Sequence, residues 1–234
     1  MKTYFKSEGQ NYTLGNKYIE RTWHYNGQSL FTTSLIDRLN NRVWIDIEAE
    51  QSMDFSYEGL TNSYTDKELK YTFELIDVQV NKINKSYCSD SGLEAVFILK
   101  DKMHGVDIRW HAVVYDDAPA VRTYIEVKSL NFPMGEFFER ERVNVLDTYR
   151  VSVTDGTLRS YEFFTRTDFT NDLVKENINP SGYDRGNLLF YNAPDDMGLF
   201  ILKESPCFKD QRPECAGNFR IENDAIQTMG WGIR

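Results

Sequence analysis

The stretch GVDIRWHAVVY (residues 105–115) decides the fold class, because its apolar and polar side chains alternate. Successive side chains of a β-strand point to opposite faces, so this alternation predicts a strand with one buried and one polar face. The apolar set is Ile108, Trp110, Ala112 and Val114, and the other set contains Arg109 and His111.

The same alternation recurs along the chain. It is present in residues 42–50, 93–100 and 120–130, and further β-branched and aromatic stretches cover residues 17–25, 29–38 and 71–83. Short turn signals such as Asn26-Gly27 and Asp155-Gly156 separate them. Roughly a dozen strands without an intervening helical period exclude a parallel α/β sheet and predict a large antiparallel sandwich.

We expect residues 1–234 to form a single domain, because no segment repeats and no low-complexity linker divides the chain. The sequence ends in the apolar, glycine-containing segment QTMGWGIR (residues 227–234). Natural termini are usually polar and solvated, so this ending predicts that the native chain continues into a further domain.

The overall charge argues against nucleic acid as a partner. The formal net charge is −9 and the sequence pI is about 4.9, whereas proteins that bind phosphate backbones carry a basic surface. No apolar run approaches the roughly 18 residues that a membrane helix needs. The first residues lack the apolar core of a signal peptide, which favours a cytoplasmic location, although a leader removed beforehand would leave the same sequence.

Motifs for metals and cofactors are absent from the sequence. It contains no HExxH, P-loop or GxGxxG pattern, and the three cysteines lack CxxC spacing, so we expect neither a metal site nor a cofactor. Cys207 and Cys215 flank a proline-containing loop and would pair only in an oxidising compartment, while Cys88 stands apart. Thiols in the core or in loops are the favoured interpretation.

The three histidines are His24, His104 and His111. Two histidines and a carboxylate in one cleft would serve acid–base chemistry on a sugar. Their spacing does not require that arrangement, and structural or surface positions are the favoured interpretation.

Tryptophan side chains are candidates for stacking on sugar rings. The alternation places Trp23 and Trp110 in the core. It places Trp44 on the face opposite Val43 and Ile45, which makes Trp44 the best candidate for carbohydrate contact. Trp231 lies between glycines near the end of the sequence and is a candidate for an interface with a missing part.

Three segments carry a resemblance to a known family. They are ERERVNVLDTYR (residues 139–150), RSYEFFTRTDFTNDLVKEN (159–177) and RGNLLFYNAPDDMGLFILKESPCFKDQ (185–211). In this order they resemble the N-terminal β-supersandwich domain of α-galactosidase-like enzymes, close to glycoside hydrolase family 36. Residues 18–44 and 105–127 extend the resemblance over most of the chain.

The resemblance implies an all-β fold, a large antiparallel β-supersandwich with a galactose mutarotase-like architecture. Enzymes of this kind add a catalytic (β/α)8 barrel whose two catalytic aspartates include one in a Lys-Trp-Asp context. No Lys-Trp-Asp is present in this chain, so no catalytic residue is carried over. The resemblance implies a domain that supports the barrel and helps to shape the sugar pocket or an oligomer interface.

This resemblance also gives an interpretation of FFTRTDFTNDLVKE (residues 163–176), where charges lie beside aromatics. We expect a structured loop that meets another domain and contains Arg166, Asp168 and Asn171, with Trp231 as a further candidate for the domain interface. Asx side chains favour such loops because they bond neighbouring backbone amides.

The sequence therefore predicts a non-catalytic domain of a carbohydrate-active enzyme. The expected partners are the catalytic barrel of the same polypeptide, carbohydrate, and further copies of the chain in a homo-oligomer. Two alternatives stay open: a free-standing carbohydrate-binding sandwich that uses Trp44, and a mutarotase-like sugar epimerase that uses paired histidines.

Overall fold

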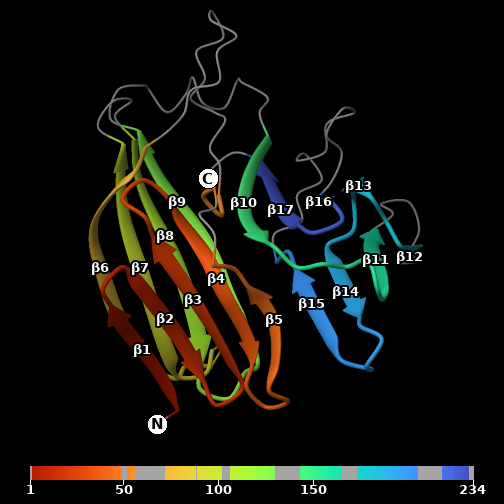
Figure 1. The fold of residues 1–234 in the computed structure, drawn as a ribbon, viewed down its shortest axis with the longest axis horizontal. Helices are drawn as coiled ribbons and strands as arrows, with labels where there is room; N and C mark the ends of the chain where they lie inside the picture. Colours follow the sequence, from red (N-terminus) through yellow and green to blue (C-terminus); the bar gives the residue numbers. More distant parts are fainter. Residues whose placement is uncertain are drawn as a thin grey trace, which may run out of the picture. The chain divides into compact units, whose positions relative to one another are not determined.

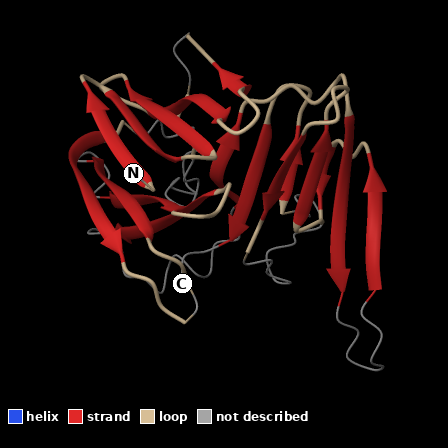
Figure 2. Cartoon of the chain, turned by 90° about the horizontal axis from the view of Figure 1, so that it is seen from below, coloured by secondary structure: helices blue, strands red, loops and turns tan. Residues whose placement is uncertain are grey.

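The structure is a computed structural model that describes residues 2–48, 52–55, 72–87, 89–101, 106–129, 143–164, 173–204 and 218–231. Every regular element in these ranges is a β-strand, as Figure 2 shows. The chain divides into two compact units, of which the first contains β1–β9 and the second contains β10–β17 (Figure 1).

The first sheet of unit 1 has five strands in sequence order, each antiparallel to the next. Hairpin connections alone build it, in agreement with the Asn26-Gly27 turn signal between β3 and β4. Asn41, in the turn between β4 and β5, has a positive φ of 56°. The strands are β1 (Thr3–Glu8), β2 (Asn11–Asn16), β3 (Ile19–Tyr25), β4 (Leu30–Asp37) and β5 (Arg42–Asp46).

The second sheet of unit 1 has four longer strands, also antiparallel and in sequence order. They are β6 (Glu74–Ile83), β7 (Gly92–Asp101), β8 (Val106–Tyr115) and β9 (Val121–Ser129). The alternating stretch that decides the fold class forms β8, which pairs with β7 on one side and β9 on the other. Its apolar set is fully buried, as the alternation predicts: Ile108, Trp110, Ala112 and Val114 each have 0% exposure.

Three aromatic side chains join the facing sides of these two sheets. Trp23 of β3 lies edge-on to Phe97 of β7, with ring centroids 5.7 Å apart, and to Trp110 of β8 at 5.3 Å. Aromatic pairs in such T-shaped arrangements stabilise a core beyond the area that they bury. The core placement of Trp23 and Trp110 is therefore confirmed.

A buried ion pair lies against this aromatic core. The Arg21 guanidinium is 5.2 Å from the Trp23 ring centroid and 3.3 Å from Asp54 Oδ2, and both charged side chains are almost completely buried. Thr32 completes the group, because its hydroxyl accepts from Arg21 and donates to Asp54 at 2.5 Å. Buried charges are tolerated only when they are paired and hydrogen-bonded in this way.

Asn16 ties the two sheets of unit 1 together at the end of β2. Its amide nitrogen donates to the carbonyls of Tyr115, the last residue of β8, and Ala118 in the following turn, each at 2.7 Å. Its side-chain oxygen accepts from the backbone amides of Tyr18 and Ile19. One fully buried side-chain amide thus bonds to four backbone groups.

Unit 2 contains two four-stranded sheets whose strand orders do not follow the sequence, β10-β17-β16-β13 and β12-β11-β14-β15. The pairs β10–β17 and β13–β16 join segments that are far apart in the chain. The strands are β10 (Val143–Tyr149), β11 (Thr157–Phe164), β12 (Leu173–Ile178), β13 (Gly182–Asp184), β14 (Leu188–Asn192), β15 (Gly198–Leu202), β16 (Phe219–Ile221) and β17 (Ile226–Trp231).

Polar side chains occupy part of the interior of unit 2. The Asp184 carboxylate is buried and accepts three hydrogen bonds. The donors are the Ser160 hydroxyl, the Gly186 backbone amide and the Asn177 side-chain amide, the last at 3.0 Å. Lys203 is also buried and donates from Nζ to an oxygen of Asn218 at 2.9 Å. These bonds fix the loop that follows β13 against the neighbouring strands.

The expectation of one large β-supersandwich is wrong. The all-β character holds, but the described strands form four small antiparallel sheets of five, four, four and four strands rather than one extended pair of sheets. Alternation shows that a strand has a buried face, but it does not identify the strand with which it pairs. The single-domain organisation of residues 1–234 stays a prediction. The described residues contain no helix that is long and apolar enough to cross a membrane.

Candidate functional site

Trp44, the predicted carbohydrate contact, lies on β5, which is an edge strand of its sheet. The register of β4 with β5 shifts there: Leu35 pairs with Ile45 and the next residue, Ile36, pairs with Val43. Trp44 is therefore the extra residue of a β-bulge. Bulges bend an edge strand and redirect a side chain.

The bulge corrects one detail of the predicted alternation. Val43 was expected on the buried face with Ile45, yet Val43 is 50% exposed while Ile45 is 1% exposed. One additional residue moves every side chain beyond it to the opposite face. Trp44 itself is half-buried, and the Arg42 guanidinium lies 4.7 Å from its ring centroid.

The side chains predicted for a domain interface lie outside the described part of the chain. Arg166, Asp168 and Asn171 lie outside the described residues, and so does the side chain of Trp231, whose backbone ends β17. The three cysteines, Cys88, Cys207 and Cys215, are also outside the described ranges.

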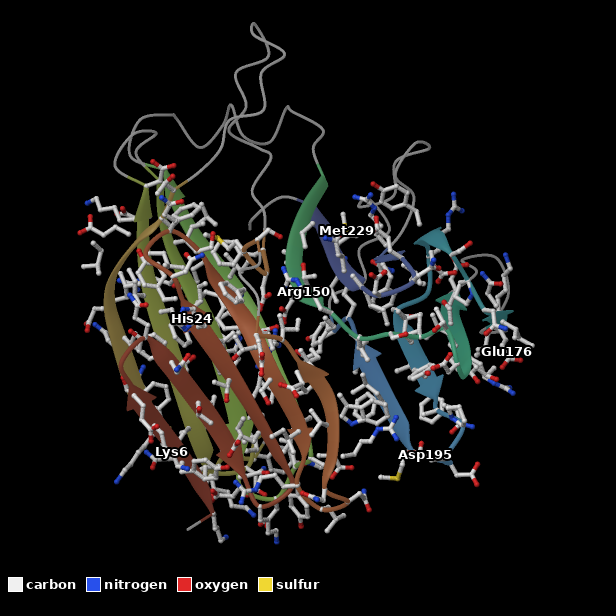
Figure 3. All side chains as sticks on the ribbon, in the orientation of Figure 1. Lys6, His24, Arg150, Glu176, Asp195 and Met229 are labelled. Atoms are coloured by element: carbon white, nitrogen blue, oxygen red, sulfur yellow. The ribbon has the colours of Figure 1, made fainter. Side chains whose placement is uncertain are left out.

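The two described histidines do not share a site. Each follows a core tryptophan, in the dipeptides Trp23-His24 and Trp110-His111, and the tryptophans face each other across the two sheets. Alternation therefore turns both histidines to the outer faces, away from one another. His24, marked on β3 in Figure 3, has its Nδ1 2.8 Å from Asn11 Oδ1. His104 is outside the described part of the chain.

His111 belongs to a polar cluster on the outer face of β6–β9, called here the Glu94 cluster: Asn81, Glu94, His111, Tyr124 and Glu126. Its centre is Glu94 on β7. Glu94 Oε1 accepts from the Tyr124 hydroxyl at 2.6 Å and lies 3.0 Å from His111 Nδ1. Glu94 Oε2 accepts from Asn81 at 3.2 Å. Four adjacent strands thus each contribute one or more side chains.

The rings of His111 and Tyr124 lie face to face, with centroids 4.2 Å apart and planes 11° apart. They come from directly paired positions on β8 and β9. This stack leaves His111 only 6% exposed and Tyr124 37% exposed. His111 Nε2 has no hydrogen-bond partner among the described residues, and its nearest charged atom is Glu126 Oε2 at 3.6 Å.

The electrostatics of the cluster follow from these contacts. Burial favours the protonated form of Glu94, but hydrogen bonds from Tyr124, His111 and Asn81 outweigh it and hold the pKa of the Glu94 carboxyl below its ordinary value. Burial and the bond to Glu94 both raise the pKa of the Tyr124 hydroxyl. The cluster therefore contains an ionised carboxylate that fixes a neutral tyrosine and one nitrogen of a histidine.

The second feature is an exposed apolar patch in unit 2. On one face of the β12-β11-β14-β15 sheet, Phe190 and Phe200 occupy paired positions and are 38% and 48% exposed. Leu202 on the same face is 51% exposed, and Val174 and Ile178 on the edge strand β12 exceed 50%. Exposed apolar patches of this kind are typical of surfaces that contact another protein or domain.

Sequence reasoning placed His111 on the polar side of its strand but did not identify its partners. Glu94 and Tyr124 are separated by 30 residues, and only the pairing of β7, β8 and β9 brings them together. Within the described ranges, no group of three or more His, Cys, Asp or Glu side chains could hold a metal ion.

Comparison with solved structures bears on the fold, whereas comparison with sequence families and curated proteins does not. No protein-family model matches the sequence. No curated protein matches it either. Among solved structures, the chain is similar to the galactosidase domain of alpha-galactosidase-sucrose kinase, AgaSK.

That similarity has a TM-score of 0.51 at 7% sequence identity and covers 98% of this chain. The chain corresponds to only 38% of the length of the solved structure. At so low an identity the comparison shows the fold alone. The fold is similar to part of a galactosidase domain, which supports the resemblance at this coarse level, while membership of family 36 stays a prediction.

Proposed function

We propose that this chain is a non-catalytic domain of a carbohydrate-active enzyme related to the retaining α-galactosidases, and that it supports a catalytic domain of the same polypeptide. The observation that carries the proposal is the fold similarity, which spans 98% of this chain but 38% of a galactosidase domain. A part of that size leaves room for a separate catalytic part. The absence of a Lys-Trp-Asp sequence agrees with this division of roles.

The apolar face of unit 2 supports a contact with a further domain. Phe190, Phe200 and Leu202 are large side chains with 38–51% exposure, and burial of this apolar area would stabilise such a contact. The segment with Arg166, Asp168 and Asn171, together with Trp231, is proposed as part of the same kind of contact.

Trp44 is proposed as a carbohydrate contact of this domain. A half-buried indole offers a flat apolar surface to the C–H groups of a sugar, and the bulge in the edge strand β5 presents it. The Arg42 guanidinium beside the ring supplies hydrogen-bond donors for sugar hydroxyls.

The first test is hydrolysis by the isolated 234-residue chain. With 4-nitrophenyl α-galactoside as substrate we expect no release of nitrophenol above the buffer control. Hydrolysis that scales with chain concentration and persists through a second purification step would contradict the non-catalytic role.

The second test addresses Trp44 by tryptophan fluorescence during titration with melibiose. We expect a saturable change in the chain and its loss in Trp44→Ala. Tyr87→Ala is the matched control, because Tyr87 is fully exposed and outside the regular strands. An unchanged titration in Trp44→Ala would remove Trp44 from the proposal.

A free-standing carbohydrate-binding domain is the second candidate, and Trp44 is the observation that favours it. The coding sequence after Arg234 separates the two candidates: a following barrel with paired aspartates supports the first, and a stop codon supports the second. The mutarotase-like alternative needs two histidines in one cleft. His24 and His111 lie on opposite outer faces and His104 lies outside the described residues, so no observation favours this alternative.

A further inference from the structure

The Glu94 cluster holds one partly exposed aromatic ring, that of Tyr124, in a fixed position. Two of its members are largely covered, since His111 is 6% exposed and the Glu94 side chain 17% exposed. Their role toward Tyr124 is positional: Glu94 fixes its hydroxyl at 2.6 Å and His111 supports one face of its ring. Tyr124 is thus held in one orientation while it stays partly exposed.

The surroundings of Tyr124 offer hydrogen-bonding groups of both kinds. Two residues further along β8 and β9, on the same outer face, Arg109 pairs with Glu126. Their charged groups are 3.8 Å apart and both side chains are more than half exposed. Residues two apart on a strand are separated by about 7 Å, so a ring stacked on Tyr124 would bring its hydroxyls within reach of this pair.

The charged groups around Tyr124 are balanced. Two carboxylates, Glu94 and Glu126, are accompanied by the guanidinium groups of Arg109 and Arg122, and the latter lies 5.6 Å from the centroid of the Tyr124 ring. A balanced set of donors and acceptors around an aromatic face offers no net attraction to an ionic ligand. It is suited to a neutral ligand with both C–H faces and many hydroxyl groups.

We propose that the outer face of β8 and β9 is a second carbohydrate-binding site, in which a neutral sugar ring stacks on Tyr124 and its hydroxyls bond to Arg109 and Glu126. His111 and Glu94 are positioning residues: they hold the tyrosine and do not contact the sugar. This inference rests on the proposed carbohydrate-associated function and adds a location that is separate from Trp44.

The test is NMR titration of the chain with melibiose, observing the imidazole ¹H–¹⁵N signals of the histidines. We expect a saturable shift of the His111 signals, because a sugar on the far face of Tyr124 changes the environment of the ring beneath it. His24 serves as an internal reference, because it belongs to the other sheet and is bonded to Asn11. Its signals should not change.

Tyr124→Ala should weaken binding at least about fivefold, since it removes the stacking surface. Tyr124→Phe keeps the ring but loses the bond to Glu94, so it should bind with intermediate affinity. It also guards against the possibility that the alanine variant fails to fold. Tyr87→Ala should bind like the unchanged chain.

Glu94→Gln should weaken binding while leaving the sugar-contacting groups in place, and Glu94→Asp should restore part of the affinity.

Two results would overturn the inference: no saturable His111 shift, or equal affinity in Tyr124→Ala and the unchanged chain. Either result leaves the proposed function intact if the fluorescence response of Trp44 to melibiose persists. Loss of both responses, or hydrolysis by the isolated chain, would instead count against the proposed function itself.

Discussion

Trp23 and Trp110 meet edge to face between the two sheets of unit 1, with ring centroids 5.3 Å apart. Each is followed by a histidine on the outer face of its own sheet. The same dipeptide thus supplies a core contact and an outward polar group in both sheets, because consecutive strand residues point in opposite directions.

This contact predicts a large effect of Trp110→Ala. The side chain is fully buried and packs against Trp23 and Phe97, so its removal should lower the free energy of unfolding by about 3–5 kcal/mol. Trp110→Phe should cost less, because it fills part of the space and removes an indole N–H that has no hydrogen-bond partner in the described residues. Urea denaturation followed by circular dichroism measures both, with Tyr87→Ala as the control. Equal losses in Ala and Phe would contradict the packing argument.

The buried pair of Arg21 and Asp54 predicts non-additive mutations. Asp54→Ala alone leaves an uncompensated charge in the core and should destabilise unit 1 by about 3–5 kcal/mol. Arg21→Met combined with Asp54→Ala should cost less than the sum of the two single changes.

A double-mutant cycle in urea checks this, with the exposed pair Lys85–Asp90 as the reference. Lys85→Ala should change the free energy of unfolding by less than about 1 kcal/mol. Additive losses at Arg21 and Asp54 would mean that the two charges do not stabilise each other.

The strands of unit 1 could be predicted because their signal is local. The alternation in residues 105–115 identifies the buried set of β8, which includes Trp110, and the pattern of residues 17–25 places Trp23 in the core. The same rule failed at Val43, where a bulge of one residue reverses the faces. A bulge depends on the partner strand, and a single strand's sequence does not report it.

The division into four sheets could not be predicted for a related reason. In unit 2, Val143 of β10 pairs with Trp231 of β17, and β13 pairs with β16. Such pairings are decided by packing between distant segments rather than by the pattern within each strand. The Glu94 cluster was missed for the same reason, since its carboxylate, imidazole and phenol come from three different strands.

Tyr4 predicts a loss of stability in alkaline solution. Burial, together with the bond from its hydroxyl to Glu20, raises the pKa of Tyr4 to about 12, from an ordinary value of 10.0. The folded state thus favours the neutral phenol. The resulting stabilisation is complete below pH 10 and is lost as the pH rises from 10 to about 12.

Tyr4→Phe isolates this contribution from the lysines that titrate in the same range. The difference in melting temperature between the unchanged chain and Tyr4→Phe should be constant up to pH 10 and should shrink between pH 10 and 12. Absorbance at 295 nm should show one fewer late-titrating tyrosine in the variant than in the unchanged chain. A pH-independent difference would contradict the raised pKa.

Glu94 predicts the opposite behaviour in acid. Its pKa lies below the ordinary value of 4.5, because hydrogen bonds from Tyr124, His111 and Asn81 favour the carboxylate in spite of burial. A depressed pKa in the folded state means that the stabilisation is present above pH 4.5 and is lost as the pH falls below it. Glu94→Gln has no carboxylate to protonate, so it should be less stable than the unchanged chain at pH 7, and this difference in stability should narrow below pH 4.5.

Thermal unfolding at pH 7, 4.5 and 3.5 measures the gap in stability between the two chains, and Glu222→Gln, which removes the carboxylate paired with Arg220 on the surface, provides the control. A gap that stays constant or widens in acid would show that the Glu94 carboxylate does not hold the cluster together.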